Sequence, residues 1–177
     1  MLPREIQINE HISLKIRKED EAETLFDLVE KNREQLRDML PWVDATQSSE
    51  DLRKFIMDCE RGYAESKKFD YGIYFDGEMI GSGGINNFRS EYRKCDFGYW
   101  IDKDFEGKGI TTTVIAHLIN EAKEKLNVHR IEIRMEPRNI ASRRIPEKLG
   151  FSYEGTMRDC AIQNGKFIDL EMWALLV

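Results

Sequence analysis

Cysteine and histidine are both scarce in this sequence of 177 residues, and their scarcity excludes several kinds of site. The three cysteines lie far apart and form no Cys-x-x-Cys pair: Cys59, Cys95 and Cys160. The three histidines have neither metal-ligand nor catalytic-triad spacing: His11, His117 and His129. This pattern favours reduced thiols over disulfides or a zinc framework, gives no support to a catalytic cysteine, and predicts no metal site.

Long hydrophobic runs and linkers are missing as well. No apolar run approaches the roughly 20 residues that cross a bilayer, and no N-terminal apolar stretch resembles a signal peptide. Only four prolines are present, no low-complexity or Pro/Gly/Ser-rich segment divides the chain, and 41% of its residues are hydrophobic. We therefore expect a single domain over residues 1–177, in a cytoplasmic protein that has no membrane partner.

The chain also lacks the positive charge that is typical of nucleic-acid-binding proteins. Its formal net charge is −6. Residues 1–60 contain 15 acidic and 9 basic side chains, so the first third carries the whole imbalance. An acidic surface disfavours direct nucleic-acid binding and is compatible with a cationic substrate, although solvated faces of amphipathic helices explain the same charges equally well.

Hydrophobic periodicity predicts both strands and helices along the chain. Strands are expected at 12–17, 71–75, 79–85, 94–101, 130–135 and from 151, and helices through 22–29, 36–40, 48–63, 110–126 and 139–149. Asp76-Gly77 and Asn164-Gly165 are typical of β-hairpin turns, so a closing hairpin is expected near the C-terminus. This order predicts an α/β (α+β mixed) fold in which helices flank a mixed sheet.

A turn containing Gly107 and Gly109 lies between the predicted strand at 94–101 and the predicted helix at 110–126. At a helix N-terminus the first N–H groups lack partners and the macrodipole attracts an anion. Glycine lets a phosphate approach the backbone, although a purely conformational use of the glycines fits the pattern equally well. A Walker P-loop is excluded, because Asp102 stands at the position of its first glycine and Gly109 at the position of its Ser or Thr. A dinucleotide fingerprint fails too, because no β-α-β opening precedes the turn.

Five ordered motifs are informative together: DFGYWI at 96–101, EGKGI at 106–110, Asn139 with Ser142, EKLGF at 147–151 and NGK at 164–166. In this order the chain resembles the GNAT superfamily of acetyl-CoA-dependent N-acetyltransferases, and more closely its RimJ/RimL-type ribosomal-protein branch. The resemblance spans nearly the whole chain. It implies the GNAT acyl-CoA N-acyltransferase fold, with a mixed, mostly antiparallel twisted sheet flanked by helices.

The resemblance implies that acetyl-CoA is the co-substrate. The strand at 94–101 and the parallel strand near Arg130 would splay apart to admit pantetheine, and the pyrophosphate would lie on the N–H groups of the glycine turn. The expected coenzyme-binding residues are Trp100, Ile101, Glu106, Gly107, Lys108, Gly109, Ile110, Thr111, Asn139 and Ser142. Backbone donors bind a diphosphate without a dedicated lysine, so we expect the side chain of Lys108 to be solvated.

Asn139 and Ser142 lie three residues apart at the start of a predicted helix. By resemblance the asparagine would hold the pantetheine arm, and the Ser142 hydroxyl would hydrogen-bond or protonate the departing thiolate. Ordinary helix capping is the alternative for both residues. Many GNAT enzymes carry a tyrosine as general acid seven residues after this asparagine, where this chain has Pro146. A thiol with a pKa near 8.5 needs little protonation, so Ser142 or solvent would suffice.

Asp96 is the predicted general base, because it occupies the strand position where the resembled branch usually has a glutamate. It shares a strand face with Trp100. A base is needed because only a neutral amine can attack a thioester. The alternatives are an ion pair of Asp96 with Lys94, Arg93 or a neighbouring strand, a carboxylate that acts through water, and Asp169 near the closing hairpin.

Trp42, in the segment LPW, matches a Pro-Trp feature of the branch and would help to wall the acceptor pocket, with a plain core role as the alternative. A basic segment of five arginines would supply either a partner for the 3′-phosphate of the coenzyme or ion pairs: Arg130, Arg134, Arg138, Arg143 and Arg144.

The expected acceptor is the N-terminal amine of a ribosomal or other basic protein. A polyamine or aminoglycoside acceptor, a non-catalytic acyl-CoA-binding role, and a homo-oligomeric state stay open.

Overall fold

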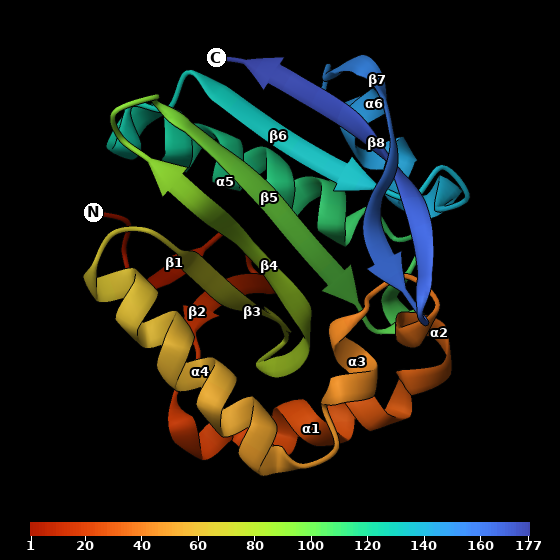
Figure 1. The fold of residues 1–177 in the computed structure, drawn as a ribbon. Coiled ribbons are helices and arrows are strands. Elements are labelled where there is room, and N and C mark those ends of the chain that lie inside the picture. The colour runs from red at the N-terminus through yellow and green to blue at the C-terminus, as the bar shows by residue number, and fades with distance from the viewer.

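The computed structural model describes residues 1–177, and its centre is an eight-stranded mixed sheet (Figure 1). The strands are β1 (Glu5–Gln7), β2 (Ile12–Ile16), β3 (Phe69–Phe75), β4 (Glu78–Arg89), β5 (Lys94–Ile101), β6 (Arg130–Met135), β7 (Ser152–Gln163) and β8 (Lys166–Leu176). Their order across the sheet is β1-β2-β3-β4-β5-β6-β8-β7. Every neighbouring pair is antiparallel except β5 and β6, which are parallel. This mixed, mostly antiparallel sheet confirms the expected fold class.

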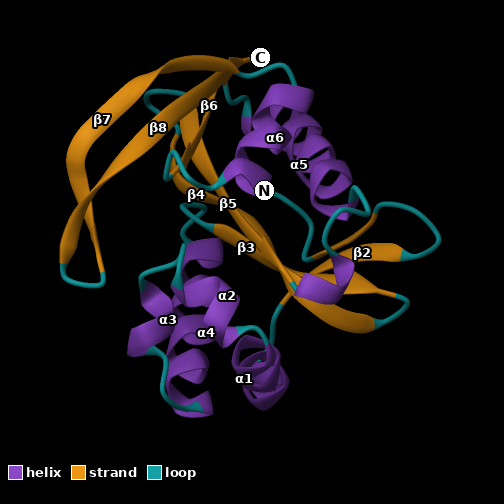
Figure 2. Cartoon of the chain, turned by 90° about the vertical axis from the view of Figure 1, so that its right-hand side faces the viewer, coloured by secondary structure: helices purple, strands orange, loops and turns teal.

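Two groups of helices cover opposite faces of the sheet (Figure 2). The first group is α1 (Ala22–Lys31), α2 (Arg33–Arg37), α3 (Trp42–Ala45) and α4 (Ser49–Ala64), and the second is α5 (Ile110–Leu126) and α6 (Ile140–Lys148). Short 3-10 turns lie at Glu19–Glu21 and Lys103–Phe105. The larger hydrophobic core packs α5 against the sheet, and the smaller one packs α1 and α4 against β3 and β4. Each helix group therefore buries its apolar stripe on its own side.

Local sequence patterns predicted most of these helices and strands. The predictions that were wrong concern short elements. The strand β1 was not predicted, because three residues are too few to show alternation. The helical stretch predicted to reach Leu40 ends at Arg37, and a further short helix, α3, begins after Pro41. Pro41 stands at the N-cap of α3, where proline's fixed φ is compatible with a helix start. The break at Pro41 was therefore predicted, but the helix that follows it was not.

The parallel strands β5 and β6 stay paired over only part of their length. The pairing runs from Lys94 opposite Arg130 to Phe97 opposite Ile133 and stops there. Beyond it β5 remains paired with β4 as far as Ile101, while β6 follows β8 as far as Met135. The two strands diverge in Figure 1. The predicted opening is therefore present, with residues 98–101 of β5 unpaired on the side of β6.

All three cysteines are free thiols, with Cys59 and Cys95 buried. No helix of the chain combines the length and the hydrophobicity that a membrane span requires.

Candidate active site

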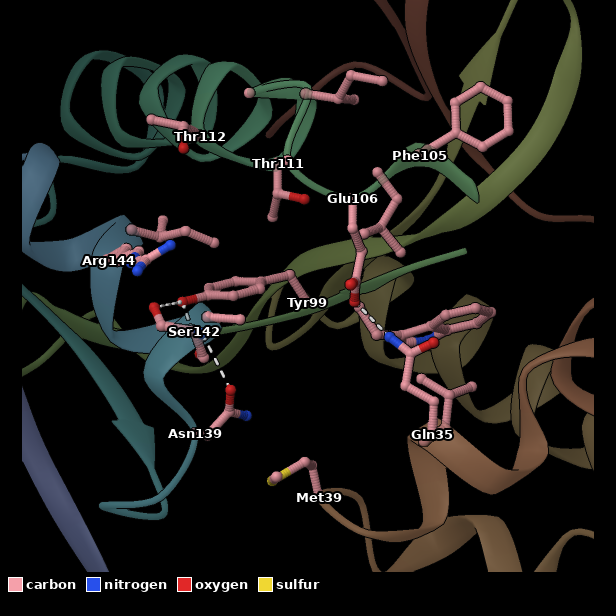
Figure 3. Close-up of a pocket in the computed structure, with 18 of the residues that line it drawn as sticks. Gln35, Met39, Tyr99, Phe105, Glu106, Thr111, Thr112, Asn139, Ser142 and Arg144 are labelled. Carbon is pink, nitrogen blue, oxygen red and sulfur yellow. Dashed lines mark hydrogen bonds between the residues drawn. The ribbon is translucent and has the colours of Figure 1, made fainter. Parts of the chain in front are cut away.

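A pocket of about 570 Å³ lies where β5, α2, α6 and the start of α5 meet (Figure 3). It contains nine of the ten predicted coenzyme residues: Trp100, Ile101, Glu106, Gly107, Gly109, Ile110, Thr111, Asn139 and Ser142. The α2 side is formed by residues that were not predicted, Gln35, Leu36, Met39 and Leu40. Gln35 donates a hydrogen bond from its side chain to the Glu106 carboxylate, which ties α2 to the glycine turn. The fold thus brings together segments that lie far apart in the sequence.

The turn before α5 presents a row of free backbone donors to this pocket. Gly107 and Gly109 adopt φ angles of +71° and +78°, in the left-handed region that favours glycine. The first α5 N–H group with a helical partner is that of Thr113, which donates to the Gly109 carbonyl at 3.0 Å. The N–H groups from Gly107 to Thr112 donate to no acceptor within the protein. They lie at the positive end of a helix of 17 residues, an arrangement that favours an anion.

Lys108 is the predicted coenzyme residue that lies outside the pocket wall. It is exposed, and its ammonium group lies 4.7 Å from the centre of the Phe105 ring. This cation–π contact keeps the charge at the surface. On the pocket wall, the turn therefore offers its backbone N–H groups and not the Lys108 ammonium.

Cations reach the pocket from α6. Four of the five arginines between 130 and 144 form ion pairs: Arg130 with Glu132 and Glu154, Arg134 with Glu132, Arg138 with Glu136, and Arg143 with Glu171. The fifth, Arg144, forms no ion pair and lines the pocket together with Lys148. Ion pairing within the protein therefore neutralises four of the five arginines, and the guanidinium of Arg144 is the one available to an anion in the pocket.

Asn139 and Ser142 lie at the start of α6 and are joined by a cap. The Ser142 backbone N–H donates to Asn139 Oδ1 at 3.0 Å, so the asparagine caps the helix while both residues line the pocket. The Ser142 hydroxyl oxygen lies 3.1 Å from the hydroxyl of Tyr99. Pro146 is buried within α6.

Tyr99 is a pocket residue that the sequence did not single out. It lies on β5, and its hydroxyl oxygen also lies 3.2 Å from the Ser142 carbonyl oxygen, a second acceptor for its single proton. Burial raises the pKa of Tyr99 to about 12. Strand alternation already placed Tyr99 on the face opposite Trp100, but only the position of α6 shows what the hydroxyl meets.

Asp96, the predicted general base, does not line this pocket. Its side chain is partly buried and lines a separate polar hollow that also contains Asn86 and Asn87. Asn87 donates a hydrogen bond to it at 3.1 Å. Burial raises the pKa of the Asp96 carboxyl, and the bond from Asn87 offsets part of that effect. The structure therefore does not bring Asp96 and Ser142 into one pocket.

The proposed alternatives for Asp96 also have definite positions. Lys94 forms its ion pair with Glu132, and Arg93 bonds Asn127, so neither pairs with Asp96. Asp169 accepts a hydrogen bond from the Asp159 backbone N–H at 2.9 Å within the closing hairpin. It lines neither the pocket nor the polar hollow.

Trp42 begins α3 and packs on Trp100, with ring centroids 6.3 Å apart. Trp42 is 37% exposed and is not part of the pocket wall, whereas Trp100 is. The pair therefore joins the pocket to the surface beside α3.

No cluster of three or more His, Cys, Asp or Glu side chains is arranged to hold a metal ion.

Comparisons with known proteins identify the family of the chain. Residues 14–152 match the acetyltransferase (GNAT) domain family. The chain is 36% identical to the putative ribosomal N-acetyltransferase YdaF of Bacillus subtilis (strain 168), over 96% of this chain and 93% of YdaF. It is 25% identical to RimL, a ribosomal L7/L12 alpha-N-protein acetyltransferase solved with coenzyme A, over 98% of each chain with a TM-score of 0.94. It is also 25% identical to the microcin C7 self-immunity acetyltransferase MccE, solved with acetyl-CoA and AMP, over 99% of this chain and 98% of MccE with a TM-score of 0.94. The chain therefore belongs to the GNAT family of N-acetyltransferases.

Proposed function

We propose that this enzyme moves an acetyl group from acetyl-CoA directly to a primary amine, and that the amine is the N-terminus of a ribosomal or other basic protein in the cytoplasm. The observation that carries the proposal is the row of free N–H groups from Gly107 to Thr112, whose residues other than Lys108 line the same pocket as Ser142. The names of the similar proteins YdaF and RimL support a ribosomal acceptor.

The residues of the pocket fit the chemical groups of the coenzyme. The free N–H groups of the turn suit a pyrophosphate, and Arg144 and Lys148 supply unpaired cations for a further phosphate. The unpaired edge of β5 at 98–101 offers backbone groups to the amides of pantetheine. When bound, acetyl-CoA supplies the thioester that the amine attacks.

Two side chains of this chain would handle the protons. Ser142 would donate a hydrogen bond to the departing sulfur, and Asp96 would take a proton from the ammonium group of the acceptor, so that the neutral amine can attack. Because Asp96 lies in a separate hollow, we propose that the proton reaches it through water. The raised pKa of its carboxyl makes Asp96 a better proton acceptor than an ordinary aspartate.

The acceptor would approach beside α2 and α3, where Trp42 packs on Trp100. The acidic excess of residues 1–60 favours a cationic acceptor on this side of the molecule. Small amines such as polyamines satisfy the same charge argument, so the acceptor needs a direct test.

That test is mass spectrometry of purified ribosomal proteins and of small amines after incubation with enzyme and acetyl-CoA. We expect a mass increase of one acetyl group at the N-terminus of at least one ribosomal protein. Acetylation of polyamines or aminoglycosides alone would replace the proposed acceptor with a small amine. Release of coenzyme A thiol without acetylation of any ribosomal protein or small amine would contradict both acceptor classes.

Arg144→Ala is expected to weaken acetyl-CoA binding about tenfold, because a charge-assisted contact to phosphate is lost. Isothermal titration measures the change, and Arg61→Ala, on α4 and paired with Asp58 at the surface, is the matched control. If Arg144 contacts the 3′-phosphate, the wild type and Arg144→Ala should bind the 3′-dephospho coenzyme equally tightly. An unchanged affinity of Arg144→Ala for acetyl-CoA would exclude Arg144 from the coenzyme site.

A further inference from the structure

The hydroxyl groups of Tyr99 and Ser142 meet inside the pocket, although they come from different parts of the fold. Tyr99 lies on β5 and Ser142 in the first turn of α6, and their oxygens are 3.1 Å apart. Figure 3 shows the Tyr99 side chain extending toward Ser142. No other side chain bonds either hydroxyl. Ser142 therefore has a single side-chain partner, and that partner lines the same pocket.

The number of protons decides what this contact can do. A serine hydroxyl has one proton and two acceptor sites. If Ser142 donates to Tyr99, it has no proton left for another acceptor. The single Tyr99 proton has two acceptors within reach, the Ser142 carbonyl oxygen at 3.2 Å and Ser142 Oγ at 3.1 Å. If it goes to the carbonyl, the contact between the hydroxyls uses the serine proton. If it goes to Oγ, the serine proton is free to point elsewhere in the pocket. The second arrangement also polarises the Ser142 hydroxyl, because hydrogen bonds in a chain strengthen one another.

We propose that Tyr99 is a positioning residue, whose hydroxyl donates to Ser142 Oγ and thereby directs the single Ser142 proton toward the departing sulfur. The inference rests on the proposed function, in which Ser142 faces the thioester. It also explains how this chain works with Pro146 in α6, since a tyrosine hydroxyl reaches the same helix from β5 instead.

The environment of Tyr99 agrees with a fixed donor and not with a proton reservoir. Burial keeps the Tyr99 hydroxyl protonated across the physiological range, because its pKa is raised to about 12. Full transfer of its proton would leave a phenolate in a poorly solvated site. Ser142 therefore stabilises the departing thiolate by donating a hydrogen bond to the sulfur, and both hydroxyl groups keep their protons.

The test is a double-mutant cycle on the full-length enzyme with the acceptor that mass spectrometry identifies. Tyr99→Phe, which keeps the ring, should lower kcat about tenfold and leave the Kd for acetyl-CoA within about twofold. Ser142→Ala should lower kcat about thirtyfold. In the Ser142→Ala background, Tyr99→Phe should have no further effect on kcat, because the proton it directs is absent. Tyr153→Phe, whose hydroxyl bonds Thr156 on β7, is the control.

The outcomes separate the two proposals. If Tyr99 has a purely structural role, through its contact with the Ser142 carbonyl, Tyr99→Phe should lower the melting temperature. It should then also lower kcat by the same factor in the wild-type and in the Ser142→Ala background. That additive result, or wild-type kcat in Tyr99→Phe, would overturn the inference while acetyl transfer by the wild-type enzyme continued. Absence of transfer by the wild-type enzyme to every amine tested would overturn the proposed function itself.

Discussion

Replacing Gly109 with valine is expected to weaken acetyl-CoA binding about a hundredfold, the largest single effect that we expect in this enzyme. Gly109 is the N-cap of α5 at φ +78°, a conformation that a β-branched side chain adopts only at a cost. A Cβ atom at this position would have no protein atom within 4 Å, so the added side chain would not clash inside the protein. It would instead displace the N–H groups that we propose bind the pyrophosphate, and isothermal titration would measure the loss of affinity.

Gly77→Val provides the control for backbone strain. Gly77 has φ +88° in the β3–β4 turn and equally open surroundings, but it lies outside the pocket. We expect both variants to lose a similar amount of stability in thermal unfolding, and only Gly109→Val to lose affinity for the coenzyme. If a folded Gly109→Val variant bound acetyl-CoA as tightly as the wild type, the turn would not be the pyrophosphate site.

Asp96→Asn should reduce turnover about fiftyfold at pH 6 and only a few-fold at pH 9, with little change in acetyl-CoA affinity. An α-amine with a pKa of about 7.8 is mostly protonated at pH 6, so a base must remove its proton before attack. Near pH 9 the free amine predominates, and the base becomes dispensable. The measurement is the pH–rate profile of both enzymes with one peptide acceptor.

The stability of Asp96→Asn distinguishes lost chemistry from lost folding. The folded pKa of Asp96 lies above its unfolded value, so its contribution to stability is greatest in acid and falls as pH rises through the folded pKa. An asparagine does not ionise, so the variant should be at least as stable as the wild type at neutral pH. Asp169→Asn is the matched control, and if its pH–rate profile changed instead, the role of base would move to Asp169.

Much of the fold was predictable because it depends on neighbours along the chain. The apolar stripe of α5, the alternation in β6 and the Asn164-Gly165 turn each specify an element from a few consecutive residues. The strand β1 escaped prediction, because its place at the sheet edge depends on pairing with β2. The helix α3 escaped it because four residues carry too little periodicity.

The sequence by itself predicted free N–H groups in a glycine turn at the start of α5, since the positive φ of such glycines and the unpartnered N–H groups of a helix start are local properties. Only the tertiary structure decided which arginine is free, that Tyr99 meets Ser142, and that Asp96 lies in a different hollow. The physical reason is that ion pairs and side-chain hydrogen bonds depend on strands and helices brought together by long-range packing. Glu154 on β7, which pairs with Arg130, and Glu171 on β8, which pairs with Arg143, stand 24 and 28 residues from their arginines, so no local spacing shows them in contact.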